Sequence, residues 1–311
     1  MRTSTPTVLL GPQTDYADVR ASLDALEVDG PVALITAGWQ EYERDDAELS
    51  AAIGRPTVNL ALHERSEDVF VRDADLAEGL SSRQYHLQRL QQFYRIRLEF
   101  SDQAARAIAV RHVDAELLDE EAAVSVAALR HHDDAHVARC VAVRESFAEA
   151  LRPHERPAVV EHVDAIAEAL SDAAAVVISG GHVASLINRL KLFRVIESAA
   201  HLPAVAWSAG AMTLCDRVVL FHDFRPNDTT VSEVLEHGVG RCPGVVVLPD
   251  AVSRVDLGDS EGIARFAMRF GPARCFTLDH GDRLGFDDGT LVDVRSRELT
   301  TAGSILTREA P

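Results

Sequence analysis

Short apolar runs that alternate with helical patterns constrain the fold of this chain more than any other feature. In the N-terminal part the apolar runs cover residues 8–10, 32–36 and 58–62. In the C-terminal part they cover residues 176–179, 202–205, 218–221, 245–248 and 275–278. Such alternation is typical of strand–helix–strand units in a parallel sheet. The sequence therefore predicts an α/β fold, a parallel sheet flanked by helices, with a terminal hairpin in residues 283–306 that turns near Gly289.

A helical block interrupts this rhythm. Between residues 75 and 173 the strand patterns disappear, and leucine, valine and alanine recur at helical spacing. A block of this length is too long for a plain crossover between two strands. We therefore predict one α/β domain over residues 1–311 with a helical insertion at 75–173 that packs over or beside the sheet.

Composition excludes several classes of partner. The chain of 311 residues has a formal net charge of −18, and aromatic residues make up 5% of it. A chain with no basic stripe and few aromatic side chains is poorly suited to bind nucleic acid. No apolar run reaches membrane-spanning length, and the four cysteines lack Cys-x-x-Cys spacing. We therefore expect a cytoplasmic protein without a nucleic-acid or membrane partner.

A serine stands between a predicted strand and a predicted helix, in residues 206–211 (AWSAGA). A sharp strand-to-helix turn brings backbone segments close together, so it needs small neighbours, and it holds the hydroxyl of Ser208 at the edge of the sheet. This layout is typical of the nucleophile elbow of hydrolases, although Ala206 replaces the usual glycine. The alternative is an alanine- and glycine-rich turn whose serine only caps the helix.

A glycine pair, Gly180 and Gly181, follows another predicted strand and opens another predicted helix. Parallel sheets bind ligands at the carboxyl ends of their strands, so we expect this pair to lie at the same edge as Ser208. Backbone N–H groups at such a turn can face a developing negative charge. With the amide of Ala209 they would form an oxyanion hole, and the alternative is a tight turn without chemistry.

Together these two motifs resemble those of the peptidase E and cyanophycinase family of serine peptidases. The family reads Gly-Gly-Asn or similar, then a leucine-rich helix, then Gly-x-Ser-Ala-Gly-Ala; this chain has residues 178–182 (ISGGH), a helix through Leu190 and residues 206–211. The resemblance is best over residues 174–285, looser over 31–43, and does not include the helical block. It implies a flavodoxin-like fold of the class I glutamine amidotransferase type.

The resemblance also implies roles for individual residues. Ser208 is the nucleophile, and Gly181 and Ala209 are the oxyanion donors. The family places an acidic residue shortly after the nucleophile, and Asp223 stands at that position.

The histidine that the family uses to activate its serine is missing from its usual position. The family has a Pro-His dipeptide after the next apolar strand, where this chain has Pro249-Asp250. A serine hydroxyl is a weak nucleophile without a base, and Asp250 cannot copy the role of an imidazole as base and then acid. His182 and His222 are the candidates to replace it. For each, the alternative is a histidine satisfied by a local hydrogen bond.

A further set of residues is predicted to bind substrate. Trp39 and Gln40 follow the predicted strand 32–36, where they either line a pocket or begin an amphipathic helix. Arg225 and Arg254 flank the expected site and can grip a carboxylate. His222 belongs to this set as well, if it is not the base.

Residues 131–136 (HHDDAH) raise the question of a metal site, because His132 and His136 share a helix face. No second segment offers ligands, and Asp133 and Asp134 are typical of a solvated helix start. We therefore predict a helix start here and no metal. No phosphate loop or dinucleotide motif is found, so no cofactor is expected.

The sequence thus predicts a serine hydrolase of the peptidase E type that cleaves a small peptide or amide through Ser208. The alternative is a catalytically inactive homologue, with Asp250 in place of the histidine, whose pocket binds a ligand or a partner. A homodimer is compatible with this fold class, by analogy alone.

Overall fold

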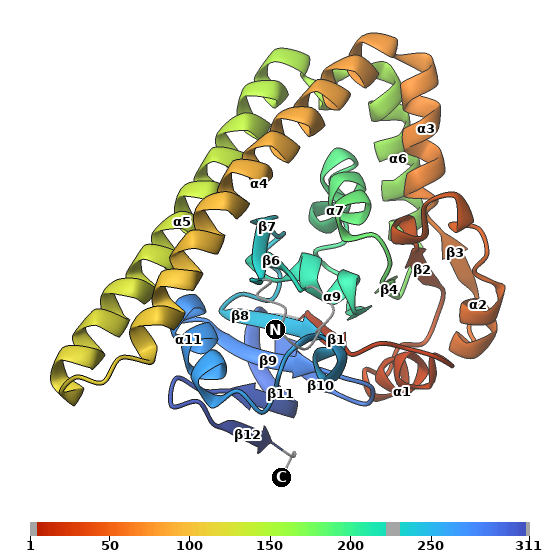
Figure 1. Cartoon of the computed structure of the whole chain (residues 1–311). Helices are drawn as coiled ribbons and strands as arrows, with labels where there is room; N and C mark the ends of the chain where they lie inside the picture. The colour runs from red at the N-terminus through yellow and green to blue at the C-terminus, as the bar shows by residue number, and fades with distance from the viewer. Residues whose placement is uncertain (1–4, 222–230, 309–311) are drawn as a thin grey trace.

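The computed structural model describes residues 5–221 and 231–308, and Figure 1 shows a central sheet surrounded by helices. The strands of the main sheet are β1 (Pro6–Leu10), β2 (Val32–Ile35), β3 (Thr57–Asn59), β4 (Ala175–Ile178), β5 (Ala204–Trp207), β8 (Val245–Pro249), β9 (Arg274–Leu278), β10 (Arg283–Asp287), β11 (Thr290–Leu299) and β12 (Ile305–Arg308). A separate ribbon contains β6 (Arg217–Leu220) and β7 (Glu233–His237).

Helices cover both faces of this sheet and form a long hairpin beside it. They are α1 (Ala17–Ala25), η1 (Ala37–Tyr42), α2 (Ala47–Ile53), α3 (Leu62–Arg72), α4 (Ala74–Ala109), α5 (Ala115–Leu151), η2 (Pro153–Glu155), α6 (Pro157–Ser171), α7 (Val183–Leu192), α8 (Val195–Ser198), α9 (Ala209–Leu214), α10 (Ala251–Arg254) and α11 (Ser260–Phe270). No helix among residues 5–221 and 231–308 is long and apolar enough to cross a membrane.

The main sheet is mixed, with strand order β3-β2-β4-β5-β1-β10-β11-β9-β8 and β12 paired to β11. The first five strands of this order are parallel to one another, as are β8 and β9. The α/β class is confirmed, and so is the terminal hairpin, formed by β10 and β11. The predicted parallel sheet is instead mixed, because β10, β11 and β12 join it with antiparallel pairing. The turn explains this: Asp288 and Gly289 both have positive φ and return the chain at once, which allows antiparallel pairing only.

Strands in the middle of the parallel part are apolar on both sides. β2 reads VALI and β4 reads AVVI, and all of these residues are buried. Successive side chains point to opposite faces, so Leu34 packs with α1 and α2 while Ile35 packs with α3, α6 and α7. Both faces are therefore covered, and continuous apolar runs replace the alternating pattern of a half-exposed strand.

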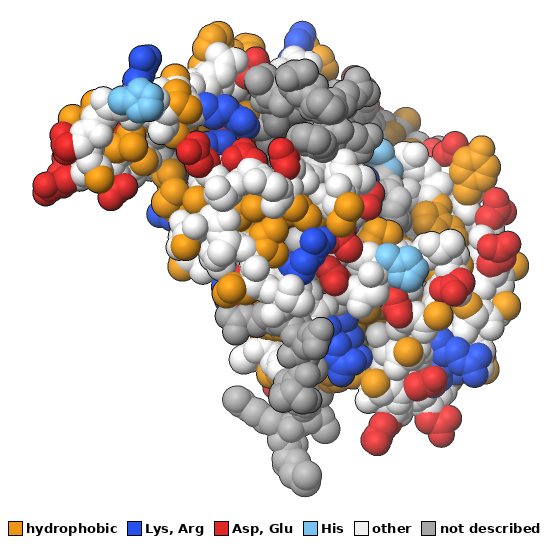
Figure 2. All heavy atoms as spheres, turned by 60° about the horizontal axis from the view of Figure 1, so that its bottom comes forward, with side chains coloured by type: hydrophobic (Ala, Val, Ile, Leu, Met, Phe, Trp, Pro, Cys, Tyr) orange, Lys and Arg blue, Asp and Glu red, His pale blue; other side chains and the backbone are white. Residues whose placement is uncertain are grey.

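The segment that the sequence assigns to a helical insertion, residues 75–173, contains α4, α5, η2 and α6. Helices α4 and α5 run side by side as an antiparallel hairpin along one flank of the sheet body (Figure 1). The far end of this hairpin exposes Phe100, Val110, Val113 and Leu117. Figure 2 shows hydrophobic and acidic side chains together on this projecting arm.

The prediction of a solvated helix start at Asp133 is wrong. Residues 131–136 lie in the middle of α5, and Asp133 is fully buried. Its carboxylate accepts bonds of 2.7 Å from Arg269 Nε and Nη2 of α11, and a bond of 2.7 Å from the hydroxyl of Tyr94 in α4. His136 stacks on Tyr94 at a centroid distance of 4.2 Å. This buried cluster fastens the hairpin to the sheet body.

Replacement of Asp133 tests this fastening. Asp133→Asn leaves the Arg269 guanidinium buried without its opposite charge, so we expect the free energy of unfolding to fall by about 3 kcal/mol in urea denaturation. Asp134→Asn is the matched control, because Asp134 pairs with Arg217 at the surface, with side chains 62% and 33% exposed. It should cost less than about 1 kcal/mol. Equal losses in the two variants would contradict the assignment.

Candidate functional site

Ser208 lies in a strained turn between β5 and α9. Its backbone has φ 49° and ψ −118°, a conformation that residues other than glycine rarely adopt. Such strain costs about 1–3 kcal/mol and persists only where the surrounding structure fixes it. One fixing contact is the Ser208 N–H, which donates to the carbonyl oxygen of Leu10 in β1 at 3.2 Å. The strand-to-helix turn predicted from the sequence is therefore confirmed.

The end of β4 approaches this turn so closely that side chains are excluded from it. A Cβ on Gly210 would lie 2.6 Å from the carbonyl oxygen of Ile178 and 2.7 Å from that of Ser179. A Cβ on Gly180 would lie 3.1 Å from the Cβ of Ser208. The glycine pair and the serine, predicted to lie at one edge of the sheet, therefore adjoin one another.

The loop after β2 packs against the loop after β4, next to the Ser208 turn. Gly181 has φ 113°, and a Cβ there would lie 2.4 Å from the carbonyl oxygen of Gly38. That oxygen accepts a hydrogen bond of 2.7 Å from the N–H of His182. The ends of β2, β4 and β5 thus form one continuous backbone surface around Ser208.

His182 caps helix α7. Its Nδ1 accepts a hydrogen bond of 3.1 Å from the N–H of Ser185 and lies 2.9 Å from Ser185 Oγ. Gln40 Nε2 donates to the same Oγ at 2.9 Å, so the structure brings Gln40 and His182 together. Because Nδ1 accepts, the neutral ring carries its proton on Nε2. Held in this way, the neutral ring of His182 offers a hydrogen-bond donor at Nε2.

Trp39 and Gln40 both belong to η1. Trp39 is half-buried and packs against the apolar cluster on the α1 and α2 face of the sheet. Gln40 has φ 57° and ψ −123°, close to the backbone conformation of Ser208. Gln40 therefore reaches the turn at His182, whereas the ring of Trp39 supports the core beside it.

Asp250 follows β8, where the family pattern has its histidine. Its φ is 57°, and its carboxylate accepts a hydrogen bond from Ser253 Oγ and lies 4.0 Å from Arg254 Nε. These contacts are local to α10. Arg254 lines a cavity of about 310 Å³ with Arg265 and Arg269, apart from the cavity that His182 lines.

Three sequence candidates, His222, Asp223 and Arg225, lie outside the described residues. Within residues 5–221 and 231–308, no hydrogen bond joins Ser208 Oγ to a histidine, and no group of His, Cys, Asp and Glu could hold a metal. Cys215 follows α9, and burial raises the pKa of its thiol well above the ordinary value, so it stays a neutral thiol.

The sequence analysis missed a cavity of about 400 Å³ between α4 and α7. His182 and Ser185 line it beside the Ser208 turn, and Arg83 lines it from α4. The available signal was the position of Arg83 between Leu80 and Leu87, inside the apolar stripe of a helix, where an arginine is unusual. The pairing of α4 with α7 is a tertiary fact that no local pattern contains.

No family model and no curated protein matches the chain. Among solved structures, the chain is similar to the crystal structure of a peptidase from an acI-B1 Actinobacterium, with a TM-score of 0.47 and 14% identity, over 98% of this chain and 97% of that chain. A likeness at this level does not establish a shared activity.

Substitution of Gly181 tests the close approach of the strand ends. Gly181→Ala adds backbone strain of about 1–3 kcal/mol and a clash of similar cost, so unfolding in guanidinium should require about 2–4 kcal/mol less. Gly281→Ala is the matched control, because Gly281 has φ 84° but nothing within 4 Å of an added Cβ. In this control the free energy of unfolding should fall only by the cost of the backbone strain, about 1 kcal/mol. A loss at Gly181 no larger than at Gly281 would show that the two backbones do not constrain each other.

Proposed function

We propose that this protein is a serine hydrolase of the peptidase E type, with a flavodoxin-like fold of the class I glutamine amidotransferase kind, that cleaves a small peptide or amide. The observation that carries this proposal is the backbone of Ser208, at φ 49° and ψ −118° between β5 and α9. Strain of this kind at a strand-to-helix turn is how hydrolases hold a serine hydroxyl clear of the sheet.

In the proposed reaction, Ser208 Oγ attacks the carbonyl carbon of the substrate and its proton passes to a base. The backbone N–H groups of Gly181 and Ala209 stabilise the negative charge that develops on the carbonyl oxygen. The C–N bond then breaks, the amine leaves with a proton, and water hydrolyses the acyl-enzyme. In this mechanism Gly181 supports the site with a glycine-specific conformation, because its φ is 113°.

The mechanism depends on which residue accepts the proton of Ser208 Oγ. His182 uses Nδ1 to cap α7 and carries a proton on Nε2, so it fits the role of a donor to substrate better than that of a base. We therefore assign proton acceptance to His222, the other histidine candidate that the sequence offers. Asp250 is not part of this assignment, because its carboxylate bonds to Ser253.

The second candidate function is ligand binding by an inactive homologue. The observation that favours it is the local role of Asp250: the residue at the family's histidine position accepts a hydrogen bond from Ser253 Oγ and lies 4.0 Å from Arg254 Nε. In this case the turn at Ser208 serves as a rigid backbone scaffold for a pocket.

Labelling with a fluorophosphonate distinguishes the two functions, since only an activated serine displaces fluoride from phosphorus. We expect labelling of the wild-type chain, complete loss in Ser208→Ala, and a loss of at least about 100-fold in the labelling rate of His222→Ala, the usual contribution of a general base. Intact-protein mass spectrometry measures the adduct.

The control for labelling is His182→Asn, because an asparagine keeps an oxygen that can cap α7 while it removes the imidazole. It should keep the labelling rate within about tenfold, less than the loss of a base would cause. A wild-type chain that is not labelled between pH 6 and pH 9 would refute the hydrolase. Labelling that His182→Asn abolishes and His222→Ala spares would refute our assignment of the base.

Asp250→His provides a separate test of the family geometry. If the site keeps the family arrangement, an imidazole at this position adds a second base, and labelling of Ser208 should become about tenfold faster or more. Asp256→His, on the loop after α10, is the control and should leave the rate unchanged. An unchanged rate in Asp250→His would show that this position no longer faces Ser208.

A further inference from the structure

The cavity between α4 and α7 combines an apolar wall with a polar wall. Phe70, Leu80 and Leu192 contribute apolar surface, and Gln84, Asn188 and Arg83 contribute polar groups. Its volume of about 400 Å³ lies within the range of sites for small organic molecules. A ligand that fits both walls has a carbon skeleton at one end and a polar group at the other.

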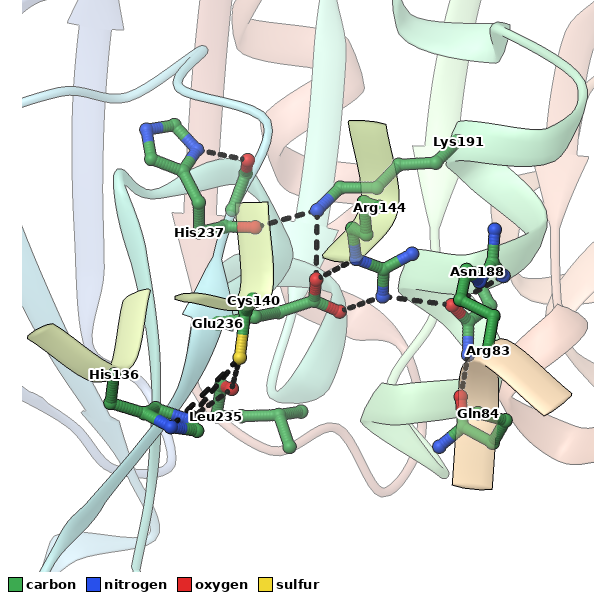
Figure 3. Close-up of polar contacts among 11 residues, drawn as sticks. Arg83, Gln84, His136, Cys140, Arg144, Asn188, Lys191, Leu235, Glu236 and His237 are labelled. Carbon is green, nitrogen blue, oxygen red and sulfur yellow. Dashed lines mark hydrogen bonds and ion pairs between the residues drawn. The ribbon is translucent and has the colours of Figure 1, made fainter. Parts of the chain in front are cut away.

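Positive charge exceeds negative charge around this cavity (Figure 3). Arg144 and Lys191 share one carboxylate, that of Glu236: Arg144 Nη2 lies 2.6 Å from Oε1, and Lys191 Nζ lies 3.1 Å from Oε2. Glu236 is buried and both of its oxygens are bonded. Its single negative charge also acts on Arg83, but it is shared with Arg144 and Lys191.

Arg83 is a third cation near this carboxylate. Its closest bond is from Nη2 to the neutral amide oxygen of Asn188, at 3.5 Å, and its Nε is buried without a hydrogen-bond partner among the described residues. Asn188 Oδ1 is already bonded to Arg144 Nη2 at 3.0 Å (Figure 3). The guanidinium of Arg83 therefore lines the cavity with donors that the described residues do not satisfy.

Two further observations indicate that a ligand of this cavity is an anion. Burial and the neighbouring charge of Arg144 lower the pKa of Arg83 to about 10, and the charge of Glu236 offsets only part of this effect. Arg189, also in the lining, makes a loose ion pair of 3.6 Å with Glu67 and lies 5.4 Å from the centre of the Phe70 ring, and its Nε too is buried without a hydrogen-bond partner among the described residues. Such a site is unusual in a chain with a net charge of −18.

We propose that this cavity binds a small organic carboxylate, with the carboxylate on Arg83 and the carbon skeleton against Phe70, Leu80 and Leu192. A planar guanidinium matches a carboxylate with two parallel hydrogen bonds. The apolar wall favours an organic acid over inorganic phosphate, which has no apolar part. The proposal goes beyond the proposed function, because it requires no chemistry at Ser208.

Isothermal titration calorimetry on the full chain tests this site with a matched pair of probes, N-acetyl-L-leucine and N-acetyl-L-leucinamide. The two differ in charge and not in shape. We expect the acid to bind and the amide to bind at least tenfold more weakly. Arg83→Met, which keeps the aliphatic stem, should weaken binding of the acid at least tenfold. Inorganic phosphate should not compete with the acid.

Two variants make the result specific. Arg89→Met lies on the same helix at an exposed position, where Arg89 bonds to Tyr85 and Gln92, and it should bind the acid like the wild type. Ser208→Ala should also bind like the wild type, so failure of the hydrolase and failure of this site are distinguishable. Equal affinity for the acid and the amide, no binding of the acid up to about 10 mM, or competition by phosphate at equal concentration would each overturn the proposal.

The unfolding temperature of the ligand-free protein provides an independent test of the role of Arg83. If Arg83 binds the carboxylate of a ligand, its guanidinium has no paired counter-ion in the free protein. Arg83→Met should then unfold at the same or a higher temperature than the wild type. Arg144→Met should unfold at a lower temperature, because it leaves the buried carboxylate of Glu236 with Lys191 as its one remaining ion-pair partner among the described residues. A loss in Arg83→Met as large as in Arg144→Met would make Arg83 a structural residue and overturn the proposal.

Discussion

Close contact between the backbones of three strand ends determines most of what this protein can do. The loops after β2, β4 and β5 touch without side chains between them, since added methyl groups on Gly181 and Gly210 would lie 2.4–2.7 Å from carbonyl oxygens. This contact places Ser208 in its strained turn and His182 at the start of α7. The site, the cavity beside it and the orientation of Gln40 all depend on it. Without it, the serine would lie in an ordinary helix cap.

Buried charge, rather than apolar surface alone, attaches the α4–α5 hairpin to the body. Asp133 binds Arg269, Arg144 binds Glu236 in β7, and Tyr94 donates to Asp133. Paired charges in a low-dielectric interior are costly unless each partner is satisfied, so they tolerate few alternative alignments. The hairpin is thereby held in one register against α7, the register that creates the cavity. The exposed apolar residues at its far end take no part in this attachment.

Local patterns were sufficient for most elements of the sheet and for the turn at Ser208. Apolar runs predicted β2, β4 and β5, and small residues around Ser208 predicted its turn, because both signals follow from backbone sterics within a few residues. The terminal hairpin was predicted as well, because its turn at Asp288 and Gly289 is a local signal. Its antiparallel pairing with β1 and β9 was not predicted, because the choice of neighbouring strand is a tertiary fact. Asp133 was misjudged because an aspartate that caps a helix and one that pairs with Arg269 look alike until the tertiary partner is known. Arg83 was missed for the same reason.

The position of β1 has a consequence for how the protein is made. Val8 pairs with Val205 on one side and with Gly285 on the other, so β1 is synthesised well before both of the strands that complete its hydrogen bonds. Until residues 283–287 emerge, one edge of β1 lacks its partner, and unpaired edges of this kind promote association between chains. The α4–α5 hairpin, whose contacts are local, can fold during this wait. Synthesis thus separates an early helical stage from a late closure of the sheet around its own N-terminal strand.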